Sequence, residues 1–167
     1  MVAQKRRYLL FEVLGSTRAA SEDELMRAFR EALEADWGQL LEAQANLRML
    51  YWSPVVHLGI LRIPTRVAQQ LRASLTLLSK LTGVPVQLRV ANCRPIPSFP
   101  VLENHHKVHC LSGALPAAQR HGDQLLREWQ RSAMQRTSTA SDCEAVKQGF
   151  ATELRLLAQV KPPPSAW

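Results

Sequence analysis

The chain has 167 residues, of which 46% are hydrophobic and 21% are charged, a balance typical of a globular protein with one core of its own. It contains no run of about 18 apolar residues, which excludes a transmembrane helix of ordinary length. The formal net charge of +7 indicates an anionic partner.

The first two predicted elements are a strand and a helix. Residues 7–14 (RYLLFEVL) are aromatic and aliphatic over the length of a strand and are followed by Gly15, so they predict a central, largely buried strand. Ser21 and Glu24 then have the spacing of a capping box. Because apolar residues recur at helical spacing after them, we expect a helix over 22–37.

The next elements complete a βαββαβ order. After an apolar turn at 40–41, residues 47–52 and 55–63 are expected to form an antiparallel hairpin. A Val/Leu stripe predicts a helix over 67–82, and the alternation in 84–90 predicts a half-buried strand. This order predicts a ferredoxin-like (RRM-like) α+β sandwich, with two helices on one face of a four-stranded sheet and the other face free for a ligand.

The C-terminal part is expected to add helices to this sandwich. Residues 91–107 contain three prolines and no periodicity, which predicts an insertion loop, so the fourth strand is 84–90, 107–111 or both. Helices are expected over about 116–133 and from Ser141 onwards. The chain thus divides into a ferredoxin-like domain (1–135), a C-terminal helix (136–160) and a disordered tail (161–167).

Acidic residues are absent from a long central stretch. Residues 43–102 contain no Asp or Glu, whereas 22–42 carry seven of the 14 acidic residues, so we expect a fold with a basic side and an acidic side. Arg48, Arg62 and Arg89 lie at strand positions of the basic stretch, where a guanidinium suits bidentate contact with phosphate. The alternative interpretation is that these arginines are solvated and have no partner.

One short stretch carries the side chains that zinc prefers, namely His105, His106, His109 and Cys110. Its spacing matches no zinc motif, and no motif places the other candidates, Cys93 and His57, so we predict a solvated loop and no metal site. The three cysteines are widely spaced and form no C-x-x-C pair, which indicates a reducing, intracellular compartment.

Motifs of catalysis and of base recognition are also missing. The chain has no G-x-S-x-G, no G-x-x-x-x-G-K-[ST] and no G-x-G-x-x-G sequence, and its basic stretch has no paired carboxylates. Catalysis by its own side chains is therefore not expected. The strand GILRI lacks the aromatic residues with which RNA-recognition sheets stack bases, so no base-specific stacking is predicted.

The chain resembles the Pop-five family of small ribonuclease P and ribonuclease MRP protein subunits. The resemblance covers roughly residues 4–133 and is carried by KRRYLLFEV at the start, an acidic helix ending at Trp37, the strand HLGILRI, the helix VAQQLRASLTLLSKLTG and a later SGAL. The family's final strand follows its second helix closely, whereas in this chain residues 91–107 intervene. The family's charged tail is replaced by KPPPSAW.

This resemblance implies a protein subunit that braces the catalytic RNA during removal of tRNA 5′ leaders and processing of ribosomal RNA. In that family the RNA and its magnesium ions do the chemistry, a barrel-like thirty-kilodalton protein is the partner, and the particle is found in the nucleus and nucleolus. The residues expected to contact RNA backbone phosphates are Lys5, Arg6, Arg7, Arg48, Arg62, Arg66 and Arg89. With roughly four to six such contacts, RNA affinity should fall with salt with a log–log slope of about −3 to −5.

Two other functions remain open on the sequence alone. One is a regulatory or oligomerisation module of the same fold that acts without RNA, and it predicts a stable homodimer. The other is a small phosphate-handling enzyme, which predicts activity of the isolated chain.

Overall fold

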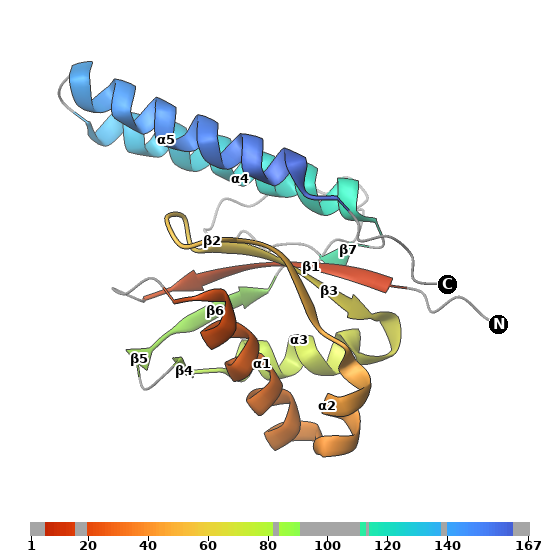
Figure 1. Ribbon diagram of the computed structural model, residues 1–167. Helices are drawn as coiled ribbons and strands as arrows, with labels where there is room; N and C mark the ends of the chain where they lie inside the picture. The colour runs from red at the N-terminus through yellow and green to blue at the C-terminus, as the bar shows by residue number, and fades with distance from the viewer. Residues whose placement is uncertain are drawn as a thin grey trace, which may run out of the picture.

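A five-stranded antiparallel sheet lies between two layers of helices in the computed structural model (Figure 1). The structure describes residues 6–15, 20–81, 84–90, 111–112, 114–137 and 140–161. The strand order is β2-β3-β1-β6, and β7 also pairs with β1. The elements are β1 (Arg6–Leu14), α1 (Glu22–Trp37), α2 (Gln39–Ala45), β2 (Arg48–Ser53), β3 (Leu58–Pro64), a 3-10 turn η1 (Thr65–Val67), α3 (Ala68–Leu77), β4 (Lys80–Leu81), β5 (Val84–Pro85), β6 (Gln87–Val90), β7 (Leu111–Ser112), α4 (Leu115–Arg136) and α5 (Ala140–Gln159).

The central strand β1 is buried on both of its faces. Leu9 and Phe11 point into the core beneath α1 and α3, and Leu10 points into a second core beneath α4 and α5. Successive residues of a strand face opposite sides, so a strand covered on both sides reads as a continuous apolar run. The expected α+β class and the central position of this strand are confirmed.

The N-terminal cap of α1 fixes the first helix on the sheet. The Ser21 backbone N–H donates to Oε2 of Glu24 at 2.8 Å, and the Glu24 N–H donates to Oγ of Ser21 at 3.2 Å. This is the predicted capping box, and the helix has the predicted bounds. From α1, Phe29 meets the ring of Phe11 edge-on, with ring centroids 5.2 Å apart.

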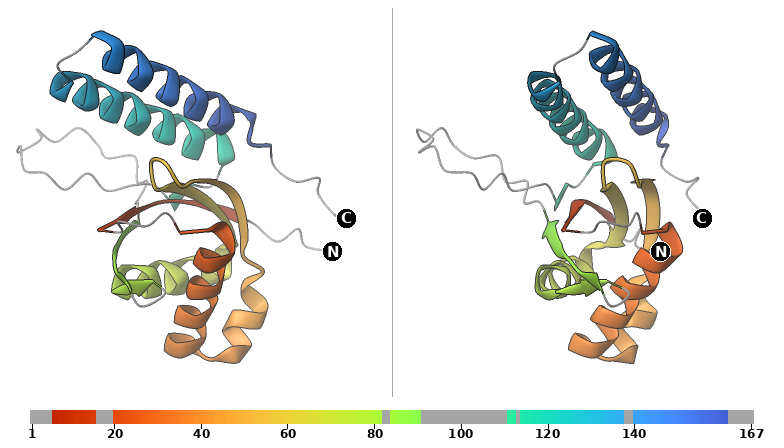
Figure 2. Two further views of the ribbon diagram at one scale, coloured as in Figure 1. Left: turned by 60° about the vertical axis from the view of Figure 1, so that its left-hand side comes forward. Right: turned by 90° about the vertical axis from the view of Figure 1, so that its left-hand side faces the viewer.

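The second face of the sheet is covered, which corrects the expectation that it is free for a ligand. Figures 1 and 2 show α4 and α5 side by side on the side of the sheet opposite α1 and α3. Leu58 and Ile60 of β3 pack there with Leu126 of α4 and Leu157 of α5. Gly122 permits this close packing, because a Cβ at its position would lie 3.0 Å from a methyl carbon of Leu157.

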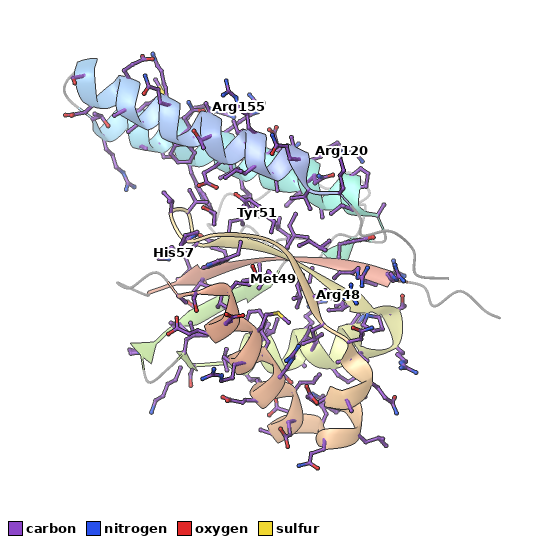
Figure 3. All side chains as sticks on the ribbon, viewed as in Figure 1. Arg48, Met49, Tyr51, His57, Arg120 and Arg155 are labelled. Carbon is purple, nitrogen blue, oxygen red and sulfur yellow. The ribbon has the colours of Figure 1, made fainter. Side chains whose placement is uncertain are left out.

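A buried hydrogen bond joins β2 to α5. The Tyr51 hydroxyl donates to Oε2 of Glu153 at 2.7 Å, and Figure 3 shows Tyr51 reaching from β2 towards the helical pair. A register shift between Met49 and Tyr51 lets both Leu50 and Tyr51 face this second core. Burial, and then the bond to Glu153, raise the pKa of Tyr51 above its ordinary value of 10.0.

This bond predicts a loss of stability in alkali. Above pH 10.0 the unfolded chain releases the Tyr51 proton while the folded chain retains it, so the free energy of unfolding should fall by up to about 1.4 kcal/mol per pH unit. The contribution is complete below pH 10.0. Urea titrations at several pH values from 8 to 11 should show this additional slope in the wild type and not in Tyr51→Phe. Equal slopes for the two proteins would contradict the assignment.

Several predicted boundaries differ from the structure. The expected turn at 40–41 is the helix α2, because Gly38 at φ 85° ends α1 and Asn46 at φ 38° ends α2. The second strand of the hairpin begins at Leu58, since residues 54–57 form the turn. Helix α3 ends at Leu77, because Leu78 adopts an extended conformation before β4. Ser141 lies within α5, which begins one residue earlier.

The fourth strand position is filled by two segments. β6 pairs with Phe11–Leu14 of β1, and β7 pairs with Tyr8 and Leu9 along the same edge. Of the predicted strand 84–90, residues 87–90 form β6, whereas Val84 and Pro85 form β5 and pair with β4. Of the alternative strand 107–111 only Leu111 is described, and it lies in β7. The predicted insertion loop, most of the predicted tail and the histidine-rich stretch lie outside the described residues. None of the helices in the described ranges is long and apolar enough to cross a membrane.

Candidate nucleic-acid interface

Three of the predicted phosphate-binding arginines come together at one end of the sheet. Arg62 of β3 lies directly opposite Tyr8 of β1 and, on its other side, Arg48 of β2. Side chains of directly opposed residues begin about 5 Å apart and share a face of the sheet. Arg6 lies two residues before Tyr8 and faces the same way. We call Arg6, Arg48 and Arg62 the arginine cluster.

Arg62 is repelled by the positive charges of the other two arginines of the cluster. Burial lowers the pKa of Arg62, and the positive charges of Arg6 and then Arg48 lower it further. Arg62 is only 6% exposed, whereas Arg6 and Arg48 are exposed. The sequence predicts Arg62 on an open face, but the structure places it on the face that α4 and α5 cover, opposite Tyr8, which packs against the second core.

The other predicted residues lie apart from this cluster. Arg7 lies opposite Ile63 and therefore faces the α1 and α3 side of the sheet. Arg66 is exposed on η1, where its guanidinium donates to the backbone oxygen of Gln44 at 3.4 Å. Arg89 lies opposite Glu12, towards the other end of β1, and Lys5 lies outside the described residues.

The acidic side predicted from the sequence adjoins this end of the sheet. One groove is lined by Arg48 and Met49 of β2 together with residues of α1 and α2, including Glu22 and Glu42. Arg30 lies 3.9 Å from Glu42 in the same groove. Arg48 makes no ion pair within 4 Å in the described part of the chain. Figure 3 shows Arg48 at the end of β2 that follows α2.

Tyr8 is the member of this site that the sequence interpretation missed. It stands two residues after Arg6, and the period of two in a strand already places both on one face. It lies directly across from Arg62, so its phenol is on the same face of the sheet as the guanidinium. In the described ranges, no three His, Cys, Asp or Glu side chains come close enough together to hold a metal ion.

Several known proteins are similar to this chain. Residues 7–94 match the model of the Rpp14/Pop5 family. Over 85 residues the chain is 32% identical to ribonuclease P protein component 2 of Thermococcus kodakarensis, and the match spans 51% of this chain and 70% of that protein. A chain in the cryo-EM structure of yeast ribonuclease MRP aligns with a TM-score of 0.45 and 12% identity, covering 62% of this chain and 84% of that one.

Proposed function

The chain belongs to the Rpp14/Pop5 family, and from this membership we propose that it is a protein subunit of a ribonuclease P ribonucleoprotein. The observation that carries the proposal is the family match over residues 7–94, which includes β3 and every residue of the arginine cluster except Arg6. The cluster supports the same function, because guanidinium groups are well suited to contact RNA phosphates.

In this proposal the protein positions RNA and does not cleave it. The RNA and its magnesium ions carry out the removal of tRNA 5′ leaders and, in a ribonuclease MRP particle, the processing of ribosomal RNA. A barrel-like thirty-kilodalton protein is the proposed partner, and the particle is proposed to work in the nucleus and nucleolus. Contacts with phosphates set where the RNA lies without reading its sequence.

The tagged full-length chain, purified from its own cells, should bring down an RNA that cleaves precursor tRNA and the thirty-kilodalton protein. Arg6→Glu should lower the recovered RNA by about tenfold or more, because a charged contact worth about 1.5–3 kcal/mol becomes repulsive. Arg155→Glu is the matched control, since Figure 3 shows Arg155 on the side of α5 turned away from the sheet. A stable homodimer that carries no RNA would refute the proposal and support the regulatory module.

A further inference from the structure

Arg62 is a largely buried residue whose guanidinium has no counter-charge in the described part of the chain. In the described part of the chain its guanidinium has no hydrogen-bond acceptor and no carboxylate within 4 Å. The remaining ranges contain a single acidic side chain, Glu103. The guanidinium nitrogens keep contact with solvent, because the buried side-chain atom without a hydrogen-bond partner in the described ranges belongs to Gln70. A charged group that loses part of its hydration without gaining a partner still costs free energy, and nitrogens that solvent reaches are open to an anion.

The neighbours of Arg62 increase this cost instead of relieving it. Arg48 is its direct cross-strand partner, and Arg6 is near enough to act on it electrostatically. Like charges placed opposite each other destabilise a sheet. Such repulsion between like charges in the free chain is expected of a site whose ligand supplies the missing negative charge.

We propose that Arg6, Tyr8, Arg48 and Arg62 form a receptor for one phosphate group of the RNA backbone. This inference rests on the proposed function and deepens it, because it assigns one phosphodiester to one set of side chains. The planar fork of Arg62 would bind two phosphate oxygens, and the Tyr8 hydroxyl is a further donor on the same face. Arg6 and Arg48 are the exposed members that attract the anion.

Phosphate fits this site better than a carboxylate or a base. Three arginines occupy neighbouring positions on three adjacent strands, β1, β2 and β3, and a tetrahedral oxyanion offers oxygens in several directions. Of the four residues, only Tyr8 is aromatic, and it is partly buried against the second core, so the receptor offers no platform for base stacking.

Thermal unfolding of the full chain in sodium phosphate and in sodium chloride of equal ionic strength tests the receptor directly. With phosphate at about 100 times its Kd, the wild type should unfold about 5–10 °C higher than in chloride. Arg62→Met should lose this response. It should also unfold at a higher temperature than the wild type in chloride, because an unpaired, partly desolvated charge beside two like charges is replaced by an apolar side chain of similar length.

Arg155→Met provides the matched control and should keep the full phosphate response, since Figure 3 shows Arg155 on α5, turned away from the sheet. If Arg62→Met does not fold, Arg48→Met decides, because Arg48 is exposed and its loss should weaken phosphate binding. The proposal is overturned if the wild type does not distinguish phosphate from chloride, if Arg62→Met keeps the response, or if Arg62→Met unfolds earlier in chloride. Inorganic phosphate is the probe, so failure of this test is distinct from failure to find ribonuclease P RNA.

Discussion

A chain that ends at residue 137, and so lacks α5, should fail to fold. The deletion removes Leu157, which is almost fully buried, and the partly buried Phe150 and Leu154 from the second core. Full burial of a side chain of this size is worth about 1.5–3 kcal/mol, so the three side chains together contribute at most roughly 9 kcal/mol, which lies within the range of the whole stability of an ordinary domain. The deletion also leaves the Tyr51 hydroxyl without its acceptor.

Circular dichroism and size-exclusion chromatography of the truncated protein measure this result. A chain lacking only residues 162–167 is the control and should behave as the wild type. The sequence predicts a separate C-terminal helix beyond residue 135, and a soluble, cooperatively folded chain of 137 residues would support that division. The same result would contradict the view that the second core needs α5.

Gly59→Val should destabilise the protein by about 3 kcal/mol, near the upper range for overpacking a core. A Cβ at Gly59 would clash with the ring of Phe11, since it would lie 2.6 Å from Cε1 and closer still to Cζ. The ring cannot easily move away, because it is stacked on Trp52 with ring centroids 5.9 Å apart. Valine itself favours a strand, so the loss reports the clash and not strand propensity.

A double-mutant cycle separates the clash from a general loss of packing. Phe11→Leu alone should destabilise the core, but combined with Gly59→Val it makes room for the new side chain. The double variant should therefore be more stable than the sum of the single effects predicts, with a coupling of about 0.5–3 kcal/mol measured by urea unfolding. Additive effects would show that Gly59 and Phe11 do not constrain one another.

Gly59 also gives a physical reason for part of the sequence motif LGILRI. In the strand LGILRI, Gly59 receives the Phe11 ring, Ile60 fills the second core and Arg62 joins the arginine cluster. Each role depends on the register with β1, which no local pattern specifies. The residues are therefore recognisable as a family motif, while their separate physical tasks require the sheet.

The helices and strands that are determined by residues close together in the chain can be predicted from the sequence. The capping box indicates the bounds of α1, and the apolar run indicates the position of β1. The same run also indicates the second helical layer, α4 and α5, which the sequence interpretation missed. Leu9, Leu10 and Phe11 are consecutive apolar residues, whereas a half-exposed strand alternates apolar and polar residues. The arginine cluster is predicted only as separate residues, because Arg48 and Arg62 meet through a bulged cross-strand register.

β6 and β7 meet the same edge of β1 at neighbouring positions. The last residue of β6, Val90, lies opposite Phe11, and the first residue of β7, Leu111, lies opposite Leu9, two residues along β1, or about 7 Å. Each doubling of the length of a flexible loop adds only about 0.6 kcal/mol to the free-energy cost of closing it. The geometry of this edge therefore sets no particular length for the connection between the two strands.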